Sequence, residues 1–335
     1  MYKKQYIGLY LFCILFCTSC TKPAAERTIT EKIHIVSWNV ETFFDAVKDG
    51  TEYKEFTSSS SKWNRDAYEA RLDKLCEAVK KLDADVYVFE EIENDGVMYD
   101  ISNRLAGNSW TPKKQWQYGC FAKKKGTATG CAVLSRLPLS SLSVHALDIR
   151  TENTTQPDMR PLMEVSLLVD GKPLILLINH WKAKSNKEKD TDVWRNWQES
   201  VLAGRFIYAS GKTGTKTAVI ACGDFNRDIF DFDWTETNDK NIILHHIGFE
   251  TAEKIAVHTP WIQGNGRYGE PGSYYYNNTW ERIDSFFAAG SASLSDFTVK
   301  TGAPWTNDNG TPAGYKVSTG TGCSDHLPIS CSVTF

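Results

Sequence analysis

The stretch Ile33-His-Ile-Val-Ser-Trp-Asn39 is a short apolar run that ends in polar side chains, and its pattern recurs along the chain. Similar apolar runs cover residues 85–89, 132–134, 163–169, 174–178, 218–221 and 283–288. Several are apolar on both faces, which is typical of central β-strands. The sequence therefore predicts an α/β protein in which several strands end in polar residues.

Two segments have helical periodicity instead. One helix is expected over residues 65–82, with its apolar stripe at Leu72, Leu75, Cys76, Val79 and Leu82. A second is expected over residues 193–210, with its stripe at Trp194, Trp197, Val201 and Leu202. A stripe with a period of 3.6 residues predicts an amphipathic helix packed on a core.

The stretch from Phe230 to Tyr276 is polar and rich in turn residues. We expect it to form loops that select the substrate, because binding residues concentrate on loops. His245, His246 and His258 lie in this stretch without a motif around them, and we interpret them as loop histidines.

Composition sets outer limits on fold and partners. The chain has 335 residues, 41% of them hydrophobic and 24% charged, which excludes a largely disordered protein. Its net charge of -3 gives no global basic footprint, so binding of a polyanion would need a local patch. No second linker follows residue 30, so we expect one domain over residues 31–335 that acts as a monomer.

The N-terminus has the features of an export signal. A charged start at Lys3 and Lys4 precedes an apolar stretch that is too short to span a bilayer comfortably. The ending Leu15-Phe-Cys-Thr-Ser-Cys20 resembles a bacterial lipoprotein signal, with residues 1–19 removed, Cys20 lipidated and residues 20–30 as a tether. An ordinary secretory signal or an uncleaved anchor is the alternative. We expect an exported lipoprotein that is anchored to a membrane.

Export would permit disulfide bonds. The best candidate pair is Cys120 with Cys131, because the two residues flank a turn at Lys125-Gly126 in a predicted hairpin. Free, buried cysteines are the alternative, since a domain of this size does not need disulfide bonds.

Oxygen and imidazole ligands gather at the ends of the predicted strands. They are Asn39, Glu91, His180, Asp224, Asn226, Asp284, Asp325 and His326. Carboxylates and carboxamides suit hard cations, and the set contains no cysteine, so we expect Mg²⁺, with Mn²⁺ or Ca²⁺ as alternatives. A cation and a proton-transferring histidine together favour cleavage of phosphate esters. Taken singly, each residue could equally be structural, such as a turn asparagine or a histidine at a strand end.

The motifs that carry these residues occur in a particular order. They are Val36-Ser-Trp-Asn39, Asp85-Val-Tyr-Val-Phe-Glu-Glu91, Gly130-Cys-Ala-Val-Leu-Ser-Arg136, Asn179-His180-Trp-Lys, Gly223-Asp-Phe-Asn226, Arg282-Ile-Asp284 and Ser324-Asp-His-Leu-Pro328. In this order they resemble the endonuclease/exonuclease/phosphatase family, which includes deoxyribonuclease I. The resemblance implies a two-sheet α/β sandwich with flanking helices and a site at one edge. Each motif alone is weak, whereas the ordered set is specific.

The resemblance also implies roles for individual residues. Asn39 and Glu91 would bind the divalent metal, and Asp325 would contact the metal or orient His326. Asp224 and Asn226 would orient the attacking water and the phosphate, and His180 would hold a phosphate oxygen. His326 would be held by Asp284, and Arg160 would lie near the scissile phosphate. Glu90 departs from the family, which commonly has glutamine there.

Two further groups of residues are candidates for substrate contact. Lys182 and Lys184 directly follow His180, where they could contact a polyanion. The run Tyr274-Tyr-Tyr276 with Trp280 could offer stacking faces to bases or a platform facing lipid. Solvated loop charge and ordinary packing are the respective alternatives.

The function that fits best is a divalent-metal phosphodiesterase, a low-specificity endonuclease that attacks nucleic acid with an activated water. The alternative is a phospholipid phosphoesterase, similar to a sphingomyelinase, or an inositol-phosphate phosphoesterase on the same scaffold. We rank the lipid substrate lower because the sequence has no long apolar hairpin for membrane insertion. A catalytically inactive surface-binding protein is a third hypothesis, against which the intact set of site residues argues.

Overall fold

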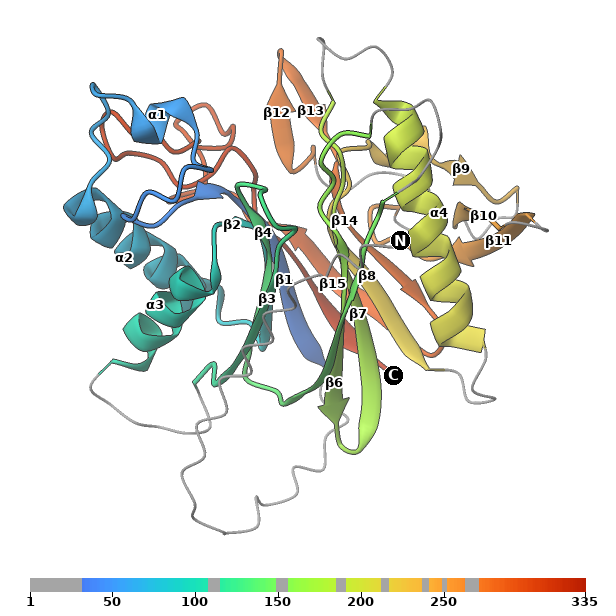
Figure 1. Ribbon diagram of the computed structural model, residues 1–335. Coiled ribbons are helices and arrows are strands. Elements are labelled where there is room, and N and C mark those ends of the chain that lie inside the picture. The colour runs from blue at the N-terminus through green and yellow to red at the C-terminus, as the bar shows by residue number, and fades with distance from the viewer. Residues whose placement is uncertain are drawn as a thin grey trace, which may run out of the picture.

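Two large β-sheets lie face to face in the computed structural model of the chain (Figure 1). The first has six strands: β1 (Ile33–Phe43), β2 (Val86–Ile92), β3 (Tyr118–Ala122), β4 (Gly130–Ser135), β15 (Ser293–Val299) and β16 (Ile329–Thr334). The second has five: β5 (Leu139–His145), β6 (Leu162–Val169), β7 (Lys172–His180), β8 (Ala218–Asp224) and β14 (Asp284–Ala289). Their strand orders are β15-β16-β1-β2-β4-β3 and β14-β8-β7-β6-β5.

The structure describes residues 32–107, 115–148, 156–184, 191–211, 217–236, 241–248, 252–262 and 271–335. The predicted signal peptide, the tether and Cys20 therefore lie outside the described residues. No helix within the described residues is both long and apolar enough to cross a membrane.

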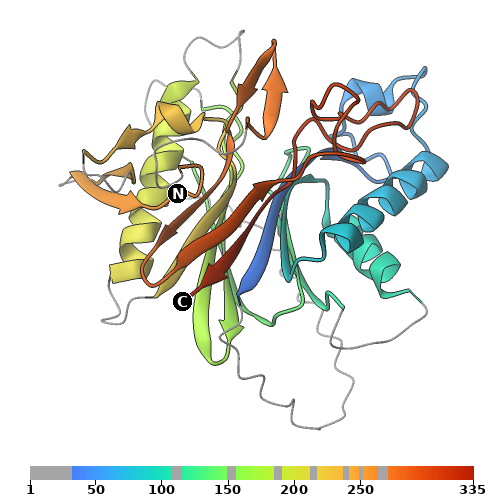
Figure 2. The same ribbon diagram turned by 180° about the vertical axis from the view of Figure 1, so that it is seen from behind.

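Helices cover the outer faces of both sheets (Figures 1 and 2). Helices α2 (Arg65–Leu82) and α3 (Asp95–Ala106) flank the six-stranded sheet, and α4 (Asp192–Gly211) flanks the five-stranded sheet. Strands β1 and β2 are parallel, as are β7 and β8, and parallel neighbours need a long crossover connection. Helices α2 and α4 lie in those two crossovers. The fold is the predicted two-sheet α/β sandwich with flanking helices.

Helix α2 has the predicted bounds and the predicted buried stripe. The Asn64 side chain accepts a hydrogen bond from the Ala67 amide at its start. Asp83 ends the helix in the left-handed conformation, where its amide bonds to the Val79 carbonyl. Local capping and apolar period therefore agree on this helix.

The predicted stripe of α4 is wrong in part. Leu202 is buried, but Trp194, Trp197 and Val201 are only half-buried. The buried face also carries polar side chains, among them Glu199, which accepts the His245 amide at 3.0 Å. Helix α4 packs on a small sheet and binds the backbone of that sheet through polar side chains. The apolar period alone therefore predicted the wrong buried face.

That small sheet lies in the stretch that we expected to be loops. It consists of β9 (Asp233–Trp234), β10 (Ile242–Ile247) and β11 (Ala252–Val257), in the order β11-β10-β9. Alternation at Ile242 and Leu244 buries only two apolar side chains in β10, which is a weak sequence signal. His245 and His246 are therefore strand residues that bond to Asp233 and to the Ser200 carbonyl.

The predicted hairpin around Lys125-Gly126 exists, but the predicted disulfide does not. In the β3–β4 register Cys120 lies opposite Val133, and Cys131 lies opposite Ala122. Both are buried and neither forms a disulfide bond, and the same holds for Cys76, Cys222 and Cys331. The two cysteines are diagonal neighbours, which the sequence could not show without the register.

Candidate active site

The predicted site residues meet where strands of both sheets end at one edge of the sandwich. His180 ends β7 and lies opposite Asp224, which ends β8, and Asp224 in turn lies opposite Asp284 in β14. Gly223 permits this close approach, because a Cβ at its φ of 131° would lie 1.9 Å from the Asn179 carbonyl oxygen. The register therefore places these side chains side by side.

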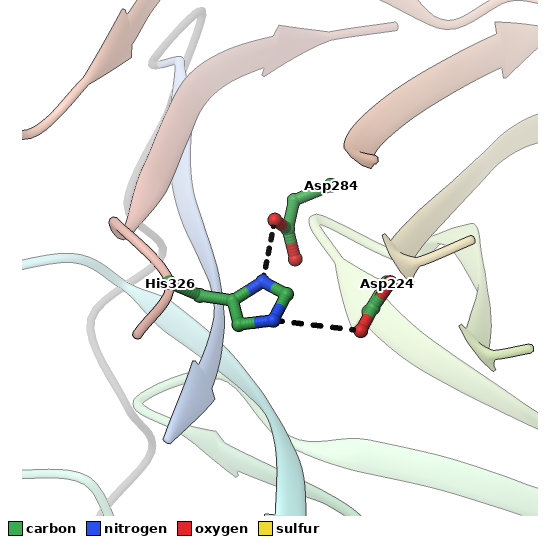
Figure 3. Close-up of side chains that lie close together, drawn as sticks. All are labelled: Asp224, Asp284 and His326. Carbon is green, nitrogen blue, oxygen red and sulfur yellow. Dashed lines mark hydrogen bonds and ion pairs between the residues drawn. The ribbon is translucent and has the colours of Figure 1, made fainter. Parts of the chain in front are cut away.

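His326 lies between two carboxylates (Figure 3). Its Nδ1 is 2.8 Å from Asp284 Oδ2, and its Nε2 is 3.9 Å from Asp224 Oδ2. The Ser273 hydroxyl donates to the same Asp284 oxygen at 2.6 Å. All four side chains are buried, so the imidazole is held in one orientation.

Asp224 is the centre of a second set of contacts. Its Oδ2 accepts from Asn39 Nδ2 at 3.1 Å, and its Oδ1 accepts from the Asn226 amide at 2.8 Å. His180 Nε2 lies 3.6 Å from the same Oδ2. The Asn226 side chain donates to the Trp181 carbonyl at 3.2 Å.

Glu91 enters the cluster from β2. Its Oε1 lies 3.5 Å from Asn39 Nδ2, 3.7 Å from His180 Nε2 and 3.9 Å from an Arg160 Nη atom. Its Oε2 accepts the Thr42 amide at 2.6 Å. One carboxylate oxygen is thus anchored to the backbone, whereas the other faces nitrogen donors at distances that leave room for a ligand.

The cluster separates the protonation states of its members. Burial by itself lowers the pKa of His326, but Asp284, Asp325 and Asp224 outweigh it and hold that pKa well above its usual range. Burial, followed by the charges of Arg160 and His326, holds the pKa of His180 well below its usual range. Burial raises the pKa of Asp224 to about 7, against the opposing charge of His326. A cationic and a neutral histidine therefore share one carboxylate.

The donor set fits a divalent cation. Carboxylate oxygens of Asp224 and Asp284 and a ring nitrogen of His326 all lie within 4.8 Å of one another, and because a cationic imidazole does not bind a metal, the oxygens are the candidate ligands. Glu91 adds a carboxylate oxygen beside them, whereas Asn39 directs its Nδ2 to Glu91 and Asp224 and accepts the Glu41 amide with its Oδ1. Asp325 Oδ1 lies 4.0 Å from His326 Nε2 on a half-exposed side chain. Oxygen-rich sets of this kind suit Mg²⁺, Mn²⁺ or Ca²⁺.

The predicted substrate-binding residues are placed differently from one another. Arg160 reaches the cluster at Glu91, as described above. Lys184 instead pairs with Glu281 at 3.2 Å, on a hairpin of β12 (Tyr274–Tyr276) and β13 (Thr279–Glu281). The backbone of Lys182 is bound by Gln198 and Arg195 of α4. Arg160 therefore contacts the cluster directly, whereas the contacts described for Lys184 and for the Lys182 backbone lie elsewhere.

The tyrosine run lies beside the imidazole. The ring of Tyr274 is 4.7 Å from that of His326, and Tyr276 stacks on Tyr274 at 6.3 Å with an interplanar angle of 12°. Tyr276 is 59% exposed. Aromatic faces therefore lead from the buried histidine to the surface of a hairpin that projects beside the site (Figure 1).

The sequence analysis missed a buried arginine behind Glu91. Arg71 of α2 donates to the carbonyls of Val40, Glu41 and Thr42, which form a turn with left-handed residues after Asn39. That turn presents the Thr42 amide to Glu91. Arg71 adjoins Leu72 on the apolar face of α2. A charged residue on such a face was the sequence feature that could have revealed this buried role.

Glu41 and Ser273 were also missed. Glu41 Oε2 accepts the amides of Tyr315 and Asp325, so it ties the loop that carries His326 to β1. Burial, followed by the charge of Asp325, raises the pKa of Glu41 to about 7. Ser273 had no sequence signal, because its role depends on a contact with Asp284 across the loop.

Glu90 is a third buried acid at this edge. It accepts a hydrogen bond from the Ser37 hydroxyl at 3.2 Å, and its other oxygen has no hydrogen-bond partner in the described part of the chain. Burial, reinforced by Asp284 and Asp224, raises the pKa of Glu90 well above its usual range. A protonated Glu90 carries no charge. In this respect it resembles the glutamine that the family commonly has at this position.

Comparisons with known proteins agree with this geometry. The sequence model described as Endonuclease/Exonuclease/phosphatase family matches residues 34–294. That range contains Asn39, Glu91, Asp224 and Asp284 but ends before His326. A search of curated proteins finds no match.

Solved structures with the same fold come from several proteins. Truncated TDP2 of Caenorhabditis elegans is 13% identical with a TM-score of 0.57, covering 91% of this chain and 98% of its own. TDP2 of D. rerio complexed with a single-strand DNA product is 17% identical with a TM-score of 0.53, covering 91% and 99%. A mannosyl-6-phosphatase of Bacteroides thetaiotaomicron is 13% identical with a TM-score of 0.53, covering 90% and 100%. At these identities the likeness establishes the fold alone.

Proposed function

We propose that this chain, which belongs to the endonuclease/exonuclease/phosphatase family of phosphoric ester hydrolases, cleaves phosphodiester bonds of nucleic acid with low sequence specificity. The observation that carries the proposal is the stack from His326 through Tyr274 to the exposed Tyr276. Aromatic faces beside a phosphate-cleaving centre suit unstacked bases, because every base can stack on them. The D. rerio neighbour complexed with a single-strand DNA product supports this substrate class.

Asn39 and Glu91 would hold the divalent metal, with Asp325 beside them. When bound, the cation neutralises charge that develops on the phosphate. Asp224, whose pKa lies near 7, is suited to accept the proton of the attacking water, and Asn226 supports its orientation. His326, kept cationic by Asp284, stabilises the phosphate oxygens together with Arg160 and the neutral His180.

A second substrate class is favoured by the pairing of Lys184 with Glu281, which weakens the basic patch that a long polyanion needs. Inositol phosphates or other small phosphate esters would not need such a patch. The mannosyl-6-phosphatase neighbour belongs to this class by its name.

The test compares hydrolysis of plasmid DNA, single-stranded DNA, RNA, inositol phosphates, mannose 6-phosphate and sphingomyelin with Mg²⁺, Mn²⁺ or Ca²⁺ and with EDTA. We expect EDTA-sensitive cleavage of nucleic acid that Glu91→Gln abolishes. Tyr276→Ala should raise KM for single strands by about ten-fold, since one base stack contributes about 1–3 kcal/mol. Cleavage of small esters alone would move the substrate and keep the site, whereas inactivity on all substrates would favour the binding-protein hypothesis.

The cell-envelope location is a proposal from residues 1–30 alone. We propose export, lipidation at Cys20 and attachment of a monomer to the membrane through this lipid. Metabolic labelling with palmitate should mark the wild-type chain and leave Cys20→Ala unlabelled, whereas equal labelling of both chains contradicts the proposal.

A further inference from the structure

A second acidic cluster lies on the loop after β1 and at the end of β2. Asp49, Glu52 and Glu93 each offer a carboxylate oxygen, and these three atoms lie within 4.8 Å of one another. The cluster shares no residue with the site around His326. Within the described residues, no lysine or arginine forms an ion pair with any of the three.

Glu93 supplies an independent indication of a ligand. The residue is 0% exposed, and its buried Oε1 has no hydrogen-bond partner among the residues that the structure describes. The other oxygen, Oε2, accepts the Asp45 amide at 2.5 Å. Leaving a buried carboxylate oxygen without a partner is unfavourable, so such an atom calls for an explanation. A cation that binds Glu93 together with Asp49 and Glu52 provides one.

The donors specify the class of cation. All three are carboxylates, and hard cations prefer such oxygens. The chain around them is an irregular turn at Gly50, whose φ is 92°, rather than a rigid frame. Ca²⁺ accepts irregular sets of oxygens completed by water, whereas Mg²⁺ demands near-ideal octahedral geometry.

We propose that Asp49, Glu52 and Glu93 form a calcium site that fastens the loop of residues 45–52 to the end of β2. This site is separate from the proposed catalytic centre and does not depend on the proposed function.

The position of the loop shows what the ion would stabilise. Glu93 lies two residues after Glu91, so the ion would stabilise the end of β2, which carries this proposed ligand of the catalytic metal. At the other end of the loop, Tyr53 packs edge-on against Phe44 at 5.5 Å. The ion and the packing of Tyr53 on Phe44 would together hold both ends of the loop beside the proposed active site.

Terbium luminescence can follow this site on the folded full chain. Tb³⁺ occupies calcium sites and emits when a nearby tryptophan is excited, and Trp63 Nε1 donates to the Asp45 carbonyl at 2.7 Å. We expect Ca²⁺-displaceable emission from the wild type and from Glu91→Gln, whose catalytic centre is altered. The double variant Asp49→Asn with Glu52→Gln should lose it, with Ca²⁺ affinity at least about ten-fold weaker by calorimetry.

A matched control removes two acids elsewhere. Glu55 and Glu77 are exposed, so Glu55→Gln with Glu77→Gln loses the same charge and should bind Ca²⁺ like the wild type. Trypsin reports the loop itself, because Lys48 lies within it and is exposed. Ca²⁺ should slow cleavage after Lys48 in the wild type, in Glu91→Gln and in the control, but not in the double variant.

Two results would overturn the proposal. One is equal Ca²⁺ affinity in the wild type and in the double variant when circular dichroism shows both folded. The other is loss of all Ca²⁺ binding in Glu91→Gln, which would place the ion in the catalytic centre alone. If the double variant does not fold, Glu93→Gln, which keeps the shape of the buried side chain, should show the same loss of affinity.

Discussion

The two sheets hold their parts of the candidate active site in different ways. On the five-stranded side, His180, Asp224 and Asp284 follow from regular strand register. On the six-stranded side the backbone is irregular, because Glu41, Thr42 and Glu91 have φ values of 54°, 45° and 67°. Each such residue costs about 1–3 kcal/mol and persists only when its surroundings impose it.

Arg71 imposes that geometry. Its guanidinium donates to three successive carbonyls and lies 3.8 Å from the centroid of the Tyr315 ring. The regular side should therefore fail only when one of its own residues is replaced. The irregular side should also fail through a residue that touches no substrate.

The largest effect is expected where the two sides meet, because His326 precedes β16 of the six-stranded sheet and bonds to Asp284 of the five-stranded sheet. His326→Gln removes the cation held by Asp284, and kcat should fall by about 100- to 10,000-fold. Metal affinity, measured by calorimetry, should not change, because a cationic imidazole is not a ligand. His145→Gln is the matched control, since its imidazole pairs with Glu164 at 2.8 Å away from the site. A parallel loss of metal affinity in His326→Gln would make this histidine a metal ligand instead.

Arg71→Lys tests the irregular side. Lysine keeps the charge but lacks the planar fork that reaches three carbonyls. Metal affinity should fall by about ten- to a hundred-fold, because Glu91 loses its support. Arg205→Lys, an arginine that pairs with Glu164, should leave metal affinity unchanged. Unchanged metal affinity in a folded Arg71→Lys variant would contradict the role of the turn.

Glu90→Gln tests a buried acid between the two sides through the pH dependence of protein stability. In the unfolded chain Glu90 ionises near its usual pKa of 4.5, whereas in the folded chain its raised pKa keeps it protonated. Ionisation thus favours unfolding as pH rises above that value, so wild-type stability is lost toward alkaline pH. The Glu90→Gln variant does not have this loss, so its Tm in EDTA should exceed the wild-type Tm by about 2–4 °C at pH 8. An equal difference at pH 4.5 would show that protonation is not the cause.

The smallest effect is expected at the rim. The double variant Lys182→Ala with Lys184→Ala should bind single-stranded DNA more weakly, with a smaller change in kcat. The difference in binding between this variant and the wild type should shrink at high salt. The Lys184 pair with Glu281 is partly exposed and contributes no more than about 1 kcal/mol to stability. Glu281→Gln should release Lys184 and strengthen DNA binding slightly. An unchanged salt dependence in the double variant would remove both lysines from the substrate path.

Strand-end chemistry was the most predictable part of the site. Asn39, Glu91, His180 and Asp224 follow apolar runs, and strand ends that meet at one edge bring such residues together. The helix over residues 65–82 followed from the apolar period, whereas the two-sheet fold was implied by the family resemblance of the ordered motifs. The three-stranded sheet in the expected loop region did not, because its strands bury few side chains and rest against polar groups of α4.

Contacts between distant segments needed the folded chain. Arg71 reaches the turn after Asn39, Ser273 orients Asp284, and Tyr274 covers His326, yet none of these pairs has a spacing that reveals it. The types of ligand and their order along the chain are properties of covalent sequence and local period. Distances, protonation states and the left-handed turn beneath Glu91 arise only when packing removes water and forces these groups together.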